Sequence, residues 1–117
     1  MEASQPQLTS RKPWFTLHAM YEILKSSTFD SWLRGLRDRD AKAKIEVRIR
    51  RLSLGNPGRF RSLKDGINEL KIDYGPGYRV YYTFKGKTLI LLLCGGDKST
   101  QSKDIRLATE IAASWET

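Results

Sequence analysis

The stretch INELKIDYGPGYRVYYTFKGKTLILLLC, residues 67–94, decides the fold. Its apolar runs, rich in aromatic and branched residues, are interrupted at Gly75-Pro76-Gly77 and at Lys85-Gly86-Lys87, where the residues favour tight turns. Another turn, Asp65-Gly66, comes just before it. The pattern predicts a meander of four strands over residues 59–64, 67–74, 78–84 and 88–94.

The strand predicted over residues 78–84 has two different faces, because successive side chains of a strand point to opposite sides. One face carries Tyr78, Val80, Tyr82 and Phe84. The other carries Arg79, Tyr81, Thr83 and then Lys85. We interpret the first face as core and the second as polar. The run LILLLC is apolar on both faces, which predicts a central strand covered on two sides.

Hairpin register can be argued from parity, because directly opposed residues share a face of the sheet. The faces stay consistent only if each hairpin loop holds an odd number of residues. Three-residue loops satisfy this in both hairpins, and they set Asp73 opposite Arg79 on one side and Leu93 beside it on the other. The turn from Gly95 to Lys98 is then expected to emerge close to Arg79.

Helices are predicted on both sides of the meander. Hydroxyls at residues 26–28 can cap a short helix that ends near Arg37. Residues 38–54 fit both strand and helix periodicity, but their Ala, Lys, Glu and Arg content favours a helix, ended by Gly55. A last helix is predicted from Thr100 to Trp115. The fold class is therefore α+β.

The sequence indicates one domain, residues 20–117, after an N-terminal extension, residues 1–19. A chain of 117 residues can bury a core without disulfides, and a core strand is expected at Tyr21 to Lys25. The extension is polar and turn-prone, so it is either a tag remnant or an overcalled start. Alternatively its large apolar residues lengthen the strand or cover a partner surface.

Charge and cysteine content limit the classes of function. The chain has 21 Lys and Arg against 13 Asp and Glu, a net charge of +8, which favours a phosphate-rich or otherwise acidic partner. The single cysteine, Cys94, cannot form an internal disulfide, so a reducing compartment is expected. No apolar run approaches the roughly 18 residues of a membrane helix, and no secretion signal is visible. We expect a cytoplasmic protein.

Parity places a group of polar side chains on one sheet face: Glu69, Lys71, Arg79 and Tyr81, with Arg61 as a neighbour and Lys98 at the rim. Arginine and lysine can bind a backbone phosphate, and a tyrosine can stack on an unpaired base of single-stranded RNA. The same groups could cleave RNA, which needs a base, cations and an acid. No second carboxylate adjoins Glu69 to hold magnesium, so no metal or other cofactor is expected.

Each of these residues also has a purely structural interpretation. Arg79 can pair with Asp73 across the hairpin, a contact worth about 0.2 to 1 kcal/mol, and spacing does not separate this from a catalytic role. Glu69 and Lys71 can be solvated, and Tyr81 can cover a neighbouring leucine.

A second group of cations lies on the segment from Arg34 to Arg51, which has eight Lys and Arg against three carboxylates. It is either a solvated helix face or an anchor on an acidic or nucleic-acid surface. The expected RNA contacts are Arg61, Lys64 and Tyr81 on the predicted strands, together with Arg48 and Arg51 on this segment.

Four segments, LRDRDAKAKI, RIRRLSLGNPG, ELKIDYGPGYRVYY and LLLCGGDKSTQSKDI, resemble the RelE/ParE toxin superfamily, in its HigB-like branch of addiction module killer proteins. The resemblance runs from about Met20 to Trp115. It implies the RelE-like fold, a twisted, antiparallel-rich sheet of four to five strands with two N-terminal helices and a C-terminal helix packed on it. It also implies a type II toxin that a cognate helix-turn-helix antitoxin neutralises.

The resemblance implies two different activities. RelE-like members cleave mRNA in the ribosomal A site without a metal, the 2′-hydroxyl attacking the adjacent phosphate, whereas ParE-like members poison DNA gyrase. One fold serves both, so fold does not choose between them. We expect a ribosome-dependent, metal-independent mRNA endoribonuclease that inhibits translation and contacts rRNA through its basic helix. The alternatives are a gyrase inhibitor acting by protein contacts and a catalytically decayed toxin.

The resemblance also implies site residues. Arg79 matches the arginine that contacts the scissile phosphate, and Lys98 matches a basic residue offered to the leaving group or a flanking phosphate. Lys71 and Glu69 fall on the strand that supplies basic and acid-base residues. Several ribonuclease members have His or Tyr near the start of the last helix, where this chain reads Gln101-Ser102-Lys103-Asp104. That departure leaves the identity of the general acid or base open.

Overall fold

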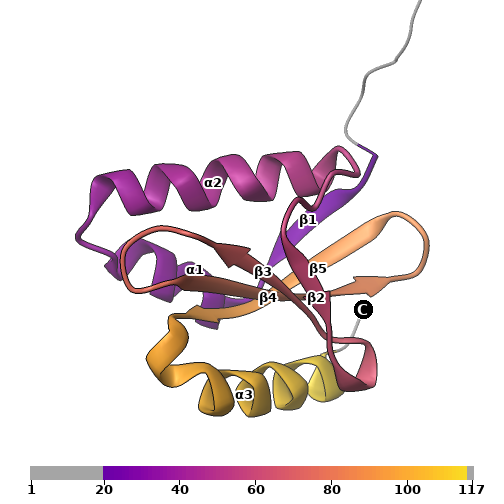
Figure 1. The fold of residues 1–117 in the computed structure, drawn as a ribbon. Helices are drawn as coiled ribbons and strands as arrows, with labels where there is room; N and C mark the ends of the chain where they lie inside the picture. The colour runs from indigo at the N-terminus through magenta and orange to yellow at the C-terminus, as the bar shows by residue number, and fades with distance from the viewer. Residues whose placement is uncertain (1–19, 116–117) are drawn as a thin grey trace, which may run out of the picture.

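The computed structural model describes residues 20–115 and has an α+β architecture (Figure 1). Its helices and strands are β1 Glu22–Lys25, α1 Ser27–Gly35, α2 Arg39–Ser53, β2 Phe60–Ser62, β3 Asn68–Ile72, β4 Tyr78–Lys85, β5 Leu89–Gly96 and α3 Gln101–Ser114. Two short 3-10 turns, η2 Lys64–Gly66 and η3 Lys98–Thr100, complete the order. The expectations for the extension, residues 1–19, lie outside the described residues.

The five strands form one mixed sheet in the order β1-β5-β4-β3-β2. The meander from β2 to β5 is antiparallel, as predicted, and β1 adds a parallel strand beside β5. Helices α1 and α2 lie on one face of the sheet and α3 on the other (Figure 1). The predicted fold class is confirmed, and the arrangement is compatible with a RelE-like fold. In the part of the chain described, no helix combines the length and hydropathy that crossing a bilayer requires.

The termini of α1 and α2 follow the predicted caps. The Ser26 hydroxyl accepts the N–H of Phe29 at 3.0 Å, and Asp38 accepts the N–H groups of Asp40 and Ala41 at 2.9 and 3.1 Å. After α2, Gly55 has a φ of 90°, the left-handed conformation that glycine adopts readily. These caps fix residues 39–53 as a helix, which resolves the ambiguous periodicity.

The sheet is covered on both faces, which corrects the expectation that one face of β4 is polar. Val80 and Tyr82 pack under α1 and α2, as predicted. On the other face, the apolar stripe of α3 around Ala108 covers Tyr81 and Leu91. Both Tyr81 and Leu91 are completely buried. The ring of Tyr81 therefore cannot stack on an RNA base in this arrangement, and that expectation is wrong.

The β3–β4 hairpin is shifted by two residues from the expected register. Lys71 lies opposite Arg79, and the loop between the strands holds five residues, 73–77, rather than three. Asp73 therefore lies outside the ladder and pairs with Arg59, so the expected Asp73–Arg79 ion pair is wrong. A shift of two preserves parity, which is why the predicted set of side chains still shares one face.

The β4–β5 pairing contains a bulge that parity does not foresee. Tyr81 lies opposite Cys94 and Tyr82 opposite Leu92, so Leu93 is the extra residue. The register of this hairpin is also shifted by two residues from the expected one, and the bulge adds one more, so Gly96 and not Leu93 lies opposite Arg79. The turn that follows β5 consequently emerges close to Arg79, as expected.

Candidate functional site

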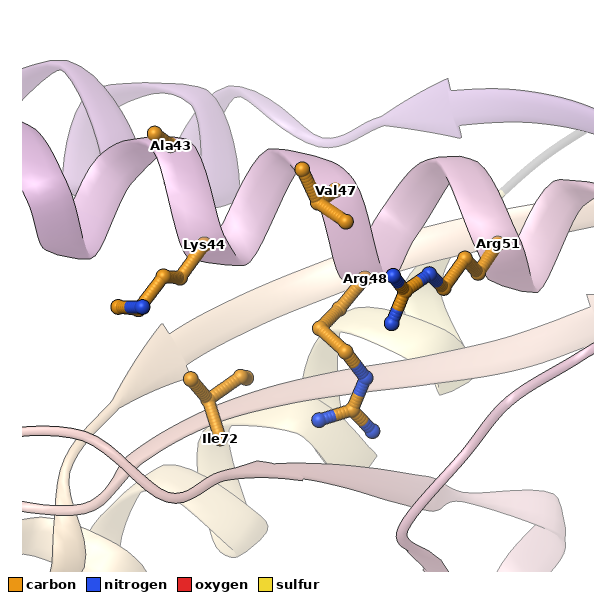
Figure 2. Close-up of a pocket in the computed structure, with 6 residues that line it drawn as sticks. All are labelled: Ala43, Lys44, Val47, Arg48, Arg51 and Ile72. Atoms are coloured by element: carbon orange, nitrogen blue, oxygen red, sulfur yellow. The ribbon is translucent and has the colours of Figure 1, made fainter.

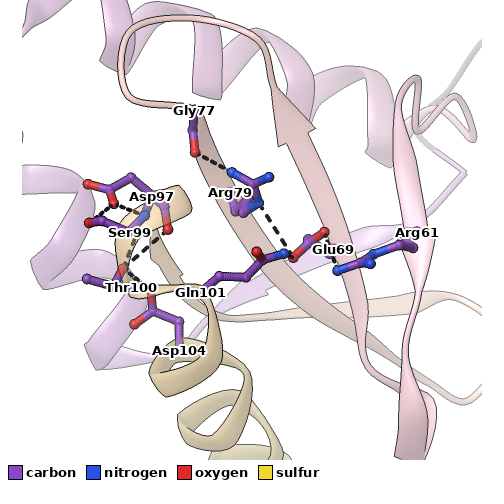
Figure 3. A network of polar contacts seen from close by, with 9 residues as sticks. All are labelled: Arg61, Glu69, Gly77, Arg79, Asp97, Ser99, Thr100, Gln101 and Asp104. Carbon is purple, nitrogen blue, oxygen red and sulfur yellow. Dashed lines mark hydrogen bonds and ion pairs between the residues drawn. The ribbon is translucent and has the colours of Figure 1, made fainter.

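Arg79 on β4 lies at the centre of a polar network between the sheet and the start of α3 (Figure 3). Its residue surface is 7% exposed. The Nη1 atom donates a hydrogen bond to the Gly77 carbonyl at 2.7 Å, and Nε lies 3.7 Å from Glu69 Oε2. Gly77 has a φ of 81°, which favours glycine, and a Cβ there would lie 3.2 Å from Nη1. The turn thus holds one side of the guanidinium.

Glu69 on β3 is the one carboxylate within residues 20–115 that forms an ion pair with Arg79, and it is completely buried. Its Oε1 lies 3.3 Å from Nη2 of Arg61, and its Oε2 accepts a hydrogen bond from Gln101 Nε2 at 2.9 Å. Two guanidinium groups and an amide therefore share this carboxylate. A carboxylate with no exposed surface is suited to balancing and orienting these cations rather than to taking a proton from a bound substrate.

Tyr81 lies opposite Glu69 in the ladder, and burial together with that carboxylate raises the pKa of its hydroxyl. The Tyr81 hydroxyl, Glu69 Oε1 and Arg79 Nε are all buried without a hydrogen-bond partner among residues 20–115. Buried polar atoms without partners are rare in folded proteins. Three of them on adjoining residues mark this cluster as the candidate site.

Three more cations border the Glu69–Arg79 pair. Lys71 is half-buried on the same sheet face, directly opposite Arg79. Lys98 is exposed in η3, and a Cβ on Gly77 would lie 3.6 Å from its Cβ. Arg61, on the edge strand β2, has a side chain that is 52% exposed. The predicted set of Arg79, Lys71, Lys98, Glu69 and Arg61 is thus gathered in one place, with a positive surface that suits a phosphate.

The turn from β5 into α3 brings two acidic groups near the site. Asp97 accepts hydrogen bonds from the hydroxyl and the N–H of Ser99, which together with the charge of Arg79 lower the pKa of its carboxyl. Asp104 is almost completely buried and accepts the hydroxyl of Thr100. It packs so closely on Gly96 that a Cβ there would lie 2.8 Å from Asp104 Cγ.

Two residues proposed to contact RNA lie on the opposite face of the sheet, away from Arg79. Arg48 on α2 donates to the carbonyls of Lys71, Pro57 and Arg59 at 2.6, 2.8 and 2.8 Å, so its guanidinium is occupied within the fold. Arg51 is exposed. Both border a groove of about 380 Å³ along α2, which Figure 2 shows with its lining residues Ala43, Lys44, Val47, Arg48, Arg51 and Ile72.

Sequence reasoning missed Gln101, and one predicted RNA contact, Lys64, lies apart from the Arg79 cluster. Lys64 lies in η2, beyond the end of β3 remote from the Arg79 turn, and is not brought to the cluster. Gln101 lies in the segment where the resemblance implies a His or Tyr, and its contact with Glu69 spans 32 residues of sequence. No local pattern signals such a contact.

Comparisons with known proteins agree with this architecture. The family described as phage derived protein Gp49-like (DUF891) matches residues 31–113. An uncharacterized protein of Haemophilus influenzae is 55% identical over 91 residues, which span 78% of this chain and 92% of that protein. A match of this extent includes all of the strands from β2 to β5 and most of the helices. The chain therefore belongs to the Gp49-like family, a family of RelE-like, toxin type.

Proposed function

We propose that this protein is the toxin of a type II toxin-antitoxin module, of the HigB-like branch, and that it cleaves mRNA on the ribosome. The observation that carries the proposal is the fixed guanidinium of Arg79, held between the Gly77 carbonyl and Glu69. A preorganised cation stabilises charge that develops on a phosphate without having to reorganise during the reaction. Membership of a RelE-like, toxin-type family supports the same conclusion.

The reaction is an attack of the 2′-hydroxyl oxygen on the adjacent phosphorus, which breaks the bond to the 5′-oxygen. The 2′-hydroxyl gives its proton to a water molecule, the leaving 5′-oxygen gains one, and the products are a 2′,3′-cyclic phosphate and a 5′-hydroxyl. Arg79 neutralises the charge that builds on the phosphoryl oxygens. Lys98, exposed beside the Gly77 turn, gives the proton to the leaving oxygen, and Lys71 binds a flanking phosphate. Glu69 orients Arg79 and does not itself accept a proton.

The partners that we propose occupy the other side of the molecule. The exposed cations Arg39 and Arg50 of α2 contact the phosphates of ribosomal RNA. The cognate helix-turn-helix antitoxin binds the groove along α2. Val47, which is 47% exposed, gives that groove an apolar surface, and Arg51 gives it a positive border. An antitoxin helix with apolar and acidic side chains would fit both features and would separate the toxin from the ribosome.

The test is expression of the protein alone, with growth recorded and the 5′ ends of cellular mRNA mapped. We expect growth arrest and new 5′ ends inside translated reading frames. Arg79→Ala and Arg79→Lys should both abolish cleavage, because a lysine lacks the planar fork that can bind a phosphate through two hydrogen bonds. The matched control is Lys103→Ala, which removes an exposed cation of α3 outside the network.

Other outcomes would identify another function. Arrest with intact mRNA, DNA damage and filamentation would indicate a gyrase inhibitor that acts through protein contacts. Harmless expression of a folded protein would indicate a toxin whose chemistry has decayed. A folded Arg79→Ala variant that still cleaves mRNA would contradict the role that we assign to Arg79.

A further inference from the structure

We infer that Gln101 is a positioning residue for Arg79 and acts through Glu69. This inference rests on the proposed function for its catalytic consequence, but its structural part stands by itself. Gln101 is the first residue of α3, and its Nε2 donates to Glu69 Oε2 at 2.9 Å. The same oxygen is the one nearest to Arg79 Nε. Figure 3 shows the three side chains converging from α3, β3 and β4.

The amide of Gln101 can be oriented in only one way. An ionised carboxylate accepts hydrogen bonds but cannot donate them, so the NH₂ group of Gln101 must face Glu69 and its carbonyl oxygen must face away. The hydrogen bond thus fixes both the amide and the carboxylate. Gln101 Nε2 is the one hydrogen-bond donor to Oε2 among the described residues, because the 3.7 Å distance from Arg79 Nε is too long for a hydrogen bond.

The position of Glu69 in turn decides where the Arg79 guanidinium points. The Gly77 carbonyl holds Nη1, and the charge of Glu69 holds the Nε side. If the carboxylate turned toward Arg61 alone, the guanidinium would keep a single fixed edge and could rotate about it. Displacement of a catalytic group by about 1 Å can lower a rate about 100-fold. Gln101 therefore connects the first turn of α3 to the orientation of the group that meets the phosphate.

The test uses two variants. Gln101→Leu removes the NH₂ group and the carbonyl oxygen of the side-chain amide, and Gln101→Glu keeps the shape but places a second carboxylate beside Glu69. The control is Ser102→Ala, an exposed change in the same turn of α3. Two measurements are made on the full chain: kcat and KM for cleavage of translated mRNA, and the Nε–Hε signal of Arg79 in a ¹H–¹⁵N spectrum. The spectrum does not depend on activity.

We expect both variants to lower kcat on the order of 10- to 100-fold, with a smaller change in KM because Lys71 still binds a flanking phosphate. We also expect the Arg79 signal to move and to exchange faster with water, whereas Ser102→Ala changes neither. Folded variants with an unchanged Arg79 signal would overturn the inference, even if their activity fell. If the unaltered protein does not cleave mRNA at all, the proposed function fails, and the spectrum alone then decides the role of Gln101.

Discussion

Gly96 lies against the carboxylate of Asp104, and any larger residue in its place would force that side chain to move. A Cβ at position 96 would lie 2.8 Å from both Asp104 Cγ and Thr100 Oγ1. On the other face of the same strand end, a Cβ at Gly95 would lie 2.6 Å from Cδ2 of Trp32. The paired glycines therefore allow α1 and α3 to close on the end of β5 from opposite sides.

Gly96→Ala should lower the free energy of unfolding by about 1 to 3 kcal/mol, the usual cost of forcing an extra methyl group into a packed site. Urea unfolding measures the change. Gly35→Ala at the end of α1 is the matched control, because a Cβ there meets nothing within 4 Å and its effect should be neutral or stabilising. The double variant Gly96→Ala, Asp104→Ala should recover part of the loss. A fully stable Gly96→Ala protein would contradict the packing described.

Glu69→Gln should lower the free energy of unfolding by about 2 kcal/mol or more, because it leaves the buried guanidinium of Arg79 without its counter-charge. Arg61→Ala is the comparison. Its side chain is 52% exposed, so the loss should be less than about 1 kcal/mol. Equal effects of the two changes in urea unfolding would mean that Glu69 serves Arg61 and Arg79 alike.

Arg48→Met should destabilise the protein by about 2 kcal/mol, because it leaves three backbone carbonyls without their charged donor. Arg48→Lys should recover little, since one ammonium cannot reproduce a planar fork. Arg51→Ala, which removes an exposed arginine of the same helix, should change stability very little. Thermal unfolding of the three variants tests this. The opposite order would restore Arg48 as a residue available to RNA.

The cap of α2 should make stability depend on pH below neutrality. The hydrogen bond from the Ala41 N–H, with those from Tyr74 and Asp40, lowers the pKa of Asp38 below its value in the unfolded chain. The stabilisation is therefore complete above about pH 5 and is lost as the pH falls through the lowered pKa. The stability difference between the protein and its Asp38→Asn variant should shrink accordingly in urea unfolding at pH 7, 4 and 3. A constant difference would exclude this contribution of Asp38.

Sequence reasoning predicted the elements and the face that each residue occupies, because both follow from local periodicity. Helix-capping residues and turn residues predict the order of α1, α2, the meander and α3 along the chain. Arg79, Lys71 and Glu69 were assigned to one face by parity alone. That assignment held although the β3–β4 register was wrong, because the error was an even number of residues.

The misses have specific physical causes. The bulge at Leu93 inserts one residue into β5. The run LILLLC contains no residue, such as glycine, whose presence would predict a bulge there. The alternation of residues assigns Tyr81 to the polar face of its strand. In the structure α3 covers Tyr81, and that contact depends on packing between elements far apart in sequence. From the sequence, Gln101 is an ordinary polar residue at the start of a helix, and only the structure shows its hydrogen bond to Glu69.

The place of α3 after the sheet in the chain affects how the protein is made. Synthesis runs from the N-terminus, so β3 and β4 leave the ribosome before the helix that covers Tyr81 and supplies Gln101. A nascent chain that carries only the sheet would contain Arg79 but not Gln101, the residue that orients Glu69 beside it. The hydrogen bond from Gln101 to Glu69 can therefore form only after α3 has left the ribosome.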